Sequence, residues 1–259
     1  MGNNQKMLSV VVPAFNEEVR LRVSLPAFCD LAASFFPKFE IIVVDDGSSD
    51  KTTDLVLSYA RQHSCIRLIR YEKNRGKGYA VRTGMLASKG DLVLFSDADL
   101  STPFTEIKKL LSALECGADV AIGSRAVKES VLVKRQPLYR MLMGKTFNKF
   151  VQFLATPGIF DSQCGFKLFT KTAALNIFND CQVNGFGFDV EVLFLARKRG
   201  FLIQEVGVDW INDSDSRVNP ITDSARMLRD LFIIRRNALL GYYGDLSGQR
   251  PEINTASSE

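Results

Sequence analysis

The strongest constraint on the fold is an apolar segment that ends abruptly in two acidic residues. After Asp91 the chain reads Leu-Val-Leu-Phe-Ser, which predicts a buried strand, and Asp97 and Asp99 follow directly. Open α/β sheets bind ligands at the carboxyl ends of their strands, so we expect both carboxylates at the mouth of a sheet. Mg²⁺ in particular binds through one or two carboxylates together with substrate phosphates. The alternative is a simple turn in which Thr102 caps a helix that begins at Pro103.

Composition bounds the architecture and excludes several classes of protein. The chain has 259 residues, 46% of them hydrophobic, which is enough for one substantial core, so we expect one catalytic domain with appendages. Its net charge of +4 is too small to indicate bulk nucleic-acid binding, and no nucleic-acid partner is expected. The five cysteines are widely spaced and form no CxxC pair, which indicates neither a zinc site nor a disulfide framework and fits a reducing cytoplasm.

The sequence predicts neither a targeting segment nor a membrane span. The polar N-terminus runs directly into an expected strand and leaves no room for a signal peptide. No window holds about 18 uninterrupted apolar residues, the length that a spanning helix requires. We therefore expect a cytoplasmic protein that is soluble or peripheral to a membrane.

Alternating apolar runs and helical patterns predict an α/β fold. Besides the strand before Asp97, we expect strands at residues 8–13, 39–44, 66–71, 118–123 and 202–210, and helices at 14–35, 52–62, 103–115 and 222–243. Asn16 is a candidate N-cap for the first helix, and Ser49 and Asp50 are candidates for the second.

Two further motifs at expected strand ends point to a nucleotide site. Asp46 follows the second strand, where an acidic residue often accepts hydrogen bonds from a nucleoside. The glycines that flank Lys77, in Asn-Arg-Gly-Lys-Gly, would expose backbone N–H groups and a positive charge to an anion such as pyrophosphate, although the spacing is not that of a Walker A loop. Together with Asp97 and Asp99, these motifs predict a pocket for a metal-bound nucleoside diphosphate.

Six motifs, taken in order, resemble those of the inverting family 2 glycosyltransferases: Val-Val-Pro-Ala-Phe-Asn-Glu, Val-Val-Asp-Asp-Gly-Ser-Ser-Asp, Asn-Arg-Gly-Lys-Gly, Phe-Ser-Asp-Ala-Asp-Leu-Ser, Ile-Gly-Ser-Arg and Asp-Ser-Gln-Cys-Gly-Phe-Lys. Within that family the motifs are most similar to the polyprenyl-phosphate hexose synthases, above all the dolichyl-phosphate β-glucosyltransferase branch, over residues 7–243. The resemblance implies a GT-A fold, a Rossmann-like and mostly parallel sheet flanked by helices, with C-terminal amphipathic helices. The domain would span residues 1–243, with a nucleotide-binding part at about 7–125 and an acceptor- and membrane-facing part at about 126–243.

The resemblance also implies an activity and roles for individual residues. The activity is metal-dependent transfer of a hexose, expected to be glucose from UDP-glucose, onto a polyprenyl or dolichyl phosphate with inversion. Asp99, together with Asp97, would hold Mg²⁺ or Mn²⁺, which would act as a Lewis acid on the leaving diphosphate. The residues expected around the nucleotide are Pro13, Ala14, Glu17 and Asp46 at the base, Lys77 at the diphosphate and Asp97 at the nucleotide.

Residues 134–155 alternate basic and apolar side chains and predict a basic amphipathic helix. Such a helix can lie in a membrane interface or pack on the sheet with a solvated basic face. The lipid acceptor implied by the resemblance favours the membrane, and Arg125, Arg135 and Arg140 are then candidates to bind its phosphate, because guanidinium matches phosphate geometry. The last helix, apolar on one side and basic on the other, is a candidate for a second membrane contact or a dimer face. Residues 244–259 are expected to be disordered.

Residues 161–169 are expected to form a loop and a short strand beneath the sugar site. Gln163 could bond sugar hydroxyls and Lys167 could bond a phosphate, so both are candidate acceptor or sugar ligands. Cys164 is expected to be a small buried residue rather than a nucleophile. His63 is the chain's one histidine, which argues against a Ser/His/Asp or Cys/His triad. The polar loop at residues 212–220 is consistent with a lid.

Asp189 lies in the first turn of a predicted helix, where the helix dipole favours an acidic residue. In relatives that use hydroxyl acceptors a carboxylate near this position acts as base, so Asp189 is a candidate base. A phosphate acceptor is already anionic and needs orientation instead, which would make Asp189 a positioning group. The alternatives left open are GDP-mannose or UDP-GlcNAc as donor, a soluble hydroxyl acceptor, a nucleotidyltransferase, and a non-catalytic nucleotide-sugar binder.

Overall fold

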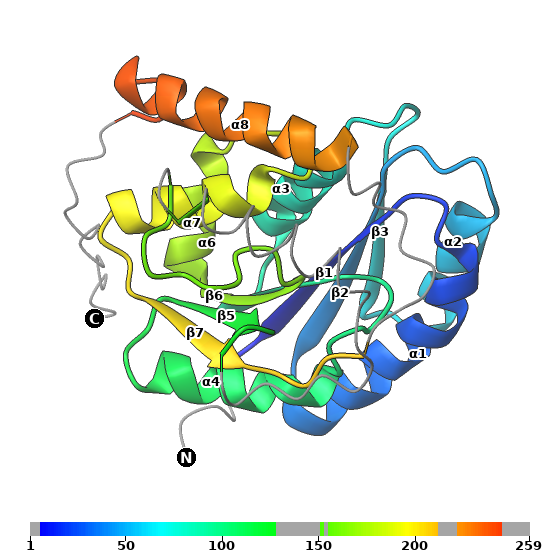
Figure 1. Ribbon diagram of the computed structural model, residues 1–259. Helices are drawn as coiled ribbons and strands as arrows, with labels where there is room; N and C mark the ends of the chain where they lie inside the picture. The colour runs from blue at the N-terminus through cyan, green and yellow to red at the C-terminus, as the bar shows by residue number, and fades with distance from the viewer. Residues whose placement is uncertain (1–5, 128–150, 153–154, 212–221, 245–259) are drawn as a thin grey trace, which may run out of the picture.

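The structure is a computed structural model that describes residues 6–127, 151–152, 155–211 and 222–244. These residues build a seven-stranded sheet in the order β3-β2-β1-β4-β6-β5-β7, with helices on both faces (Figure 1). The strands are β1 (Leu8–Ala14), β2 (Phe39–Asp45), β3 (Ile66–Arg70), β4 (Leu92–Ser96), β5 (Val120–Ser124), β6 (Phe166–Thr170) and β7 (Ile203–Gly207).

The sheet is mostly parallel, as the GT-A prediction requires. β1 pairs in parallel with β2 and β4, β2 with β3, and β5 with β7. β6 is inserted antiparallel between β4 and β5, so that Phe166 at its start lies opposite Ser96 at the end of β4. The amino end of β6 therefore lies at the same edge of the sheet as the carboxyl ends of its neighbours.

Strand residues alternate between two hydrophobic cores, one on each face of the sheet. Val11 and Phe95 belong to the core on one face, and Val10, Val12 and Leu94 to the core on the other. Because both faces are covered, the strands are continuous apolar runs rather than patterns of apolar and polar residues, which is typical of parallel sheets.

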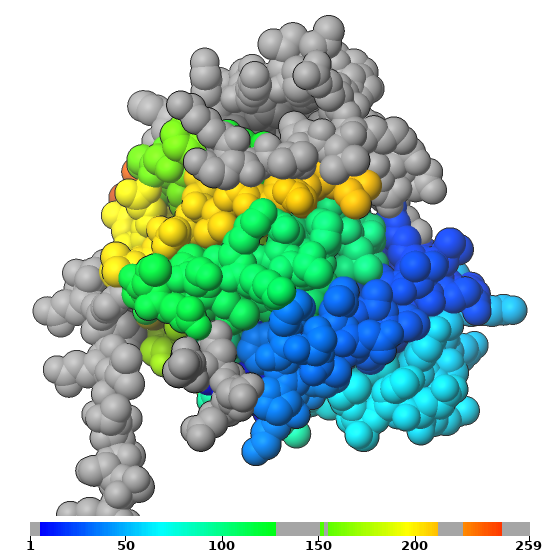
Figure 2. Space-filling view, turned by 90° about the horizontal axis from the view of Figure 1, so that it is seen from below, coloured from blue at the N-terminus to red at the C-terminus, as the bar shows by residue number. Residues whose placement is uncertain are grey.

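The helices divide between the two faces. The helices are α1 (Glu18–Phe35), α2 (Thr52–Gln62), α3 (Lys77–Ala87), α4 (Ile107–Glu115), α6 (Lys171–Asp180), α7 (Phe188–Lys198) and α8 (Thr222–Leu239), with a 3₁₀ turn η2 (Phe104–Glu106) before α4. In Figure 1, α3, α6, α7 and α8 lie on the upper side of the sheet, whereas α1, α2 and α4 cover its other face, toward the lower side and the right of the view. Figure 2 shows the blue, cyan and green segments that include α1, α2 and α4 side by side on the lower face.

Two candidate helix caps considered from the sequence are not formed. Asn16 does not cap α1: its backbone has a φ of 55°, and its side chain accepts hydrogen bonds from the N–H groups of Ser49 and Asp50 at 2.7 and 3.2 Å. Thr102 does not cap a helix at Pro103, because no side-chain hydrogen bond caps η2 there; its hydroxyl contacts Cys164 Sγ at 3.8 Å. Asp50 does bond the first turn of α2, where it accepts the N–H of Thr52 at 2.9 Å.

Within the described residues, no helix combines the length and the apolar character needed to cross a bilayer. Several predictions concern parts of the chain outside the described residues: most of the basic helix at 134–155 with Arg135 and Arg140, the loop at 212–220, and the tail after residue 244.

Candidate active site

The carboxyl edge of the sheet opens into a pocket of about 1150 Å³. It is lined by the segments that follow β1, β2, β3, β4, β5 and β7, by the turn that precedes β6, and by the amino-terminal turn of α7 and one face of α8. This location agrees with the general rule for open α/β sheets. The predicted site residues that line the pocket are Pro13, Ala14, Glu17, Asp46, Lys77, Asp97, Asp99, Arg125, Gln163 and Asp189.

The glycine-flanked loop before α3 lines the pocket through Gly76, but the N–H groups of its two glycines have internal partners instead of facing an anion as predicted. Asp46 accepts the N–H groups of Arg75 and Gly76, both at 2.8 Å. The N–H of Gly78 goes to the carbonyl of Asn184 at 2.8 Å. A Cβ atom at Gly76 would lie only 2.3 Å from that carbonyl oxygen, so the glycine permits close packing. The loop therefore supplies the side chain of Lys77 to the pocket, while these N–H groups serve internal contacts.

Asp97, Asp99 and Lys77 form the charged centre of the pocket. The ammonium of Lys77 lies 2.7 Å from Oδ1 of Asp97, and Asp99 accepts the N–H of Ser101 at 2.9 Å. Burial lowers the pKa of Lys77, but the Asp97 carboxylate, with the charges of Asp189 and Asp99, outweighs burial and raises it. Lys77 is therefore a permanent cation at physiological pH.

The two carboxylates at the end of β4 suit a hard divalent cation that takes its remaining ligands from the phosphates of a bound substrate. Asp97 and Asp99 offer carboxylate oxygens to the pocket, and Asp97 already binds a cation in the form of the Lys77 ammonium. Among the described residues, no group of three or more His, Cys, Asp or Glu side chains is placed to hold a metal. Two carboxylates completed by substrate phosphates would match the way in which Mg²⁺ is usually bound.

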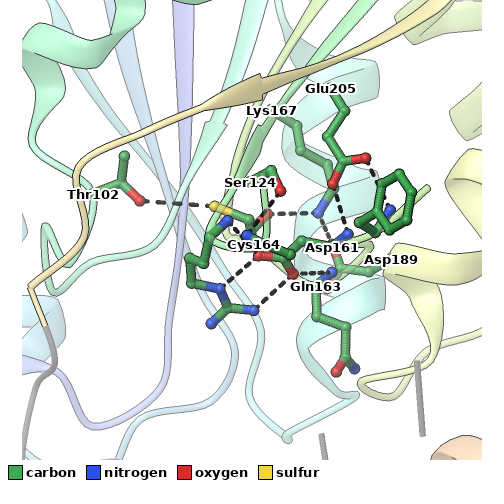
Figure 3. Close-up of polar contacts among 11 residues, drawn as sticks. Thr102, Ser124, Asp161, Gln163, Cys164, Lys167, Asp189 and Glu205 are labelled. Carbon is green, nitrogen blue, oxygen red and sulfur yellow. Dashed lines mark hydrogen bonds and ion pairs between the residues drawn. The ribbon is translucent and has the colours of Figure 1, made fainter. Parts of the chain in front are cut away.

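Lys167 does not line the pocket as predicted. It alternates with Phe166 and Leu168 along β6 and points into the opposite core, with 1% of its side chain exposed. There its ammonium forms an ion pair with Asp189 and donates to the carbonyl of Cys164 at 2.7 Å (Figure 3). Lys167 is therefore unable to reach an acceptor phosphate, and that prediction is wrong.

Asp189 lies at the pocket wall, at the start of α7, and is almost completely buried. Burial raises its pKa, and this effect outweighs the lowering by the positive charges of Lys167 and Lys77. Cys164, predicted to be buried, is 1% exposed, and burial raises the pKa of its thiol to about 11. Cys164 is thus a poor nucleophile at neutral pH.

Arg125 is held rigidly at the end of β5. Its Nε and Nη2 donate to the two oxygens of Asp161 at 2.7 and 2.8 Å. Asp161 is fixed in turn by Glu205 on β7, which accepts the N–H groups of Phe160 and Asp161 at 2.9 and 2.7 Å (Figure 3). The guanidinium of Arg125 also lies 5.4 Å from the ring of Trp210. Arg125 thus enters the pocket with a fixed orientation.

One face of α8 forms a wall of the pocket, a role that was not predicted for this helix. Helical spacing places Arg226, Arg229 and Arg236 on that face, with Asp230 and Asn237 beside them. The predicted apolar stripe is only partly buried: Met227, Leu231 and Ile234 enter the core, whereas Phe232 and Leu239 are exposed. The i, i+3, i+10 spacing of the three arginines places them on one face of a helix, and this pattern in the sequence could have indicated a basic wall.

Comparison with known proteins confirms the resemblance inferred from the motifs. Residues 9–178 match glycosyl transferase family 2. The chain is 40% identical over 258 residues to a dolichyl-phosphate beta-glucosyltransferase of Drosophila melanogaster, covering 95% of this chain and 79% of the fly protein. It is 38% identical over 253 residues to that of Homo sapiens, covering 91% of this chain and 77% of the human protein.

Solved structures agree with the fold. Glucosyl-3-phosphoglycerate synthase from Mycobacterium tuberculosis, in complex with Mn²⁺, uridine diphosphate and phosphoglyceric acid, superposes with a TM-score of 0.66 at 20% identity, covering 96% of this chain and 81% of that one. At this identity the likeness establishes the GT-A architecture alone. The family match over residues 9–178 and the relatives at 38–40% identity establish that the chain belongs to glycosyl transferase family 2, a family of sugar-transferring enzymes.

Proposed function

We propose that this protein transfers glucose from UDP-glucose to dolichyl phosphate or a similar polyprenyl phosphate, with inversion at the anomeric carbon and with Mg²⁺ or Mn²⁺. The proposal is supported by the similarity to dolichyl-phosphate beta-glucosyltransferases over most of the chain. Use of a uridine nucleotide and a divalent metal is supported by the structural neighbour that binds Mn²⁺ and uridine diphosphate.

The observation that carries the proposal is the charge distribution of the pocket. Asp97 and Asp99 lie at the end of β4, while the cations Lys77 and Arg125 and the arginine face of α8 line the same space. A reaction between a nucleoside diphosphate sugar and a phosphate monoester brings two anionic groups together. Guanidinium groups are well suited to hold the second anion, because they match phosphate geometry.

Each charged residue of the pocket has its own role in the proposed reaction. Asp97 and Asp99 would hold the metal, which supplies Lewis-acid stabilisation of the departing diphosphate. Lys77 adds a positive charge beside the same group. Arg125, fixed by Asp161, orients the acceptor so that a phosphate oxygen attacks the anomeric carbon in line as the bond to the diphosphate oxygen breaks. The acceptor oxygen is already anionic, so no base has to remove a proton.

A hydroxyl acceptor would require a free general base, and the position of Asp189 disfavours that alternative. Its carboxylate is bound by Lys167, which is itself buried. Burial raises the pKa of Asp189 overall, so the obstacle is access: a general base must reach the acceptor hydroxyl, and the Asp189 carboxylate is almost completely buried and bound to Lys167. The phosphate acceptor therefore fits the pocket better.

The acceptor proposal includes peripheral attachment to the cytosolic face of a membrane. The outer face of α8 supports it, because Phe232 and Leu239 are 66% and 84% exposed and Arg235 lies between them. Exposed apolar side chains interspersed with cations are typical of helices that lie in an anionic membrane interface. A homo-oligomer or a membrane partner that covers this face is the alternative.

A donor-by-acceptor panel tests the proposal. UDP-glucose, GDP-mannose and UDP-GlcNAc are each combined with dolichyl phosphate, a soluble sugar and buffer alone, in the presence of Mg²⁺ or Mn²⁺, and nucleoside diphosphate release is measured. We expect release from UDP-glucose with dolichyl phosphate, and a β-linked lipid product. Faster release with another donor, or with the soluble sugar, would replace the proposed donor or acceptor, and no release with any pair would leave a nucleotide-sugar binder.

A further inference from the structure

Four charged side chains of alternating sign run from the pocket into the core. Asp97 contacts Lys77 at 2.7 Å, Lys77 is close enough to Asp189 for their charges to interact, and Asp189 is paired with Lys167. The two ammonium groups lie 5.5 and 5.6 Å from the centre of the same ring, Phe95. Asp189 is therefore the second anion available to Lys77.

The inner half of this row is rigid. The side chains of Lys167 and Asp189 are 1% and 7% exposed, and Lys167 has a second partner in the carbonyl of Cys164 (Figure 3). Lys167 is directly opposite Phe95 in the β4–β6 ladder, and the Phe95 ring packs edge-on against Phe188 at 5.6 Å. The Asp189 carboxylate is thus held in one place by both its ion pair and the packing around it.

The outer half of the row is open to the donor. The side chains of Lys77 and Asp97 are 28% and 33% exposed, and both line the pocket. Under the proposed function, Asp97 turns to the metal and nucleotide when the donor binds. Lys77 then loses its contact partner and would be free to adopt many rotamers, as long lysine side chains do. Asp189 is the anion that remains behind it.

We propose that Asp189, fixed by Lys167, is a positioning residue that holds the Lys77 ammonium toward the donor diphosphate when Asp97 is engaged. This inference rests on the proposed donor. It assigns Asp189 and Lys167 no contact with the reacting atoms, and it explains why a cation that cannot reach the pocket is buried beneath it.

A double-mutant cycle between positions 77 and 189 tests the inference. The variants are Lys77→Met, Asp189→Asn and the combination, with Asp54→Asn and Lys198→Met as matched controls at exposed helix positions. Calorimetry with UDP and Mn²⁺ measures affinity without any acceptor, and steady-state kinetics gives kcat and KM for UDP-glucose. If Asp189 acts through Lys77, each single variant weakens UDP binding by about tenfold, and the combination is no weaker than Lys77→Met alone.

Several results of these measurements would overturn the inference about Asp189. Additive losses in the cycle, or a loss of kcat in Asp189→Asn with unchanged UDP affinity, would overturn the inference, the second result indicating a base. If Asp189→Asn does not fold, Lys167→Met/Asp189→Asn, which removes both buried charges, takes its place in the cycle. UDP affinity of that variant equal to the wild type would also overturn the inference. Failure of the proposed function appears elsewhere, as absent UDP release from wild-type protein with UDP-glucose and dolichyl phosphate.

Discussion

Gly165 lies so close to the Asp97 carboxylate that no residue larger than glycine fits at position 165. A Cβ atom at position 165 would lie 1.9 Å from Oδ2 of Asp97, and the N–H of Asp97 donates to the carbonyl of Gly165 at 3.0 Å. The turn before β6 thus serves as a support for the carboxylate that binds Lys77. The glycine is required by space, since its φ is not in the left-handed region.

We therefore expect Gly165→Ala to displace the Asp97 carboxylate and to lower kcat/KM for UDP-glucose by about 100-fold, because small misplacements of catalytic groups carry large costs. Gly117→Ala is the control: its Cβ meets nothing within 4 Å, but its φ of +100° makes the substitution strained. That variant should lose about 1 kcal/mol of stability and keep its activity. Wild-type kinetics in Gly165→Ala would contradict the assigned role of Asp97.

The pH dependence of stability should report the Arg125–Asp161 pair. Burial raises the pKa of Asp161, but the Arg125 guanidinium outweighs burial and holds the pKa below its ordinary value of 3.8. The pair therefore stabilises the fold fully above pH 3.8, and this contribution is lost as the pH falls through the lower, folded-state pKa. We expect Asp161→Asn to lower the free energy of unfolding by about 2 kcal/mol at neutral pH.

Urea unfolding at several pH values measures this difference. The gap between wild type and Asp161→Asn should narrow as the pH falls below the ordinary pKa of 3.8, because the unfolded chain takes up the proton first. A gap that is the same at all pH values would mean that the pair does not control the titration of Asp161.

Removal of Lys167 should destabilise the fold strongly. Lys167→Met leaves the Asp189 carboxylate buried without its partner, and breaking one side of a buried pair typically costs about 3–5 kcal/mol. Lys167→Met/Asp189→Asn, which removes both charges, should regain most of that loss. Chemical denaturation of the three proteins measures the effect, and a double variant no more stable than Lys167→Met would show that the ion pair is not the reason for the loss.

Asp99 offers a direct test of metal use. If Asp99 holds the cation, Asp99→Asn should raise the Mn²⁺ concentration needed for half-maximal activity by about tenfold or more, since even substitutions beside a metal ligand often have effects of this size. A Mn²⁺ titration of activity, after treatment with a chelator, measures the change, and Asp54→Asn serves as the exposed control. Full activity of Asp99→Asn in the presence of chelator would exclude the metal site at the end of β4.

The parallel half of the fold and the donor side of the pocket could be predicted from local patterns. Each apolar run that ends in a proline or an acidic residue became a strand, and Ala14, Asp46 and Asp97 lie at the carboxyl edge because parallel strands deliver their ends there. The antiparallel direction of β6 could not be predicted in the same way. The direction of β6 depends on its pairing with β4 and β5, which are distant in the sequence, and the residue pattern of a strand does not reveal its direction.

The predictions for individual residues that proved wrong also failed because contacts distant in the sequence decide the role of a side chain. Lys167 stands within an apolar strand, and its alternation with Phe166 and Leu168 places its side chain on the opposite face; only tertiary packing reveals that this face is buried too and that Asp189 is the partner of Lys167. The carbonyl of Asn184, which binds the N–H of Gly78, comes from a distant loop and could not be foreseen either. The local motif identified a site, and non-local contacts decided what each group does in it.

The reversed direction of β6 has a consequence for how such an enzyme can change. The chain leaves the sheet at Arg125, just after β5, and re-enters it after Gln163, and both residues line the pocket. The end of β5 and the start of β6 thus lie at the same rim of the sheet, beside the pocket. If the proposed function holds, we expect replacements between these two ends to change the acceptor that the enzyme uses, because the strands on either side can keep their register.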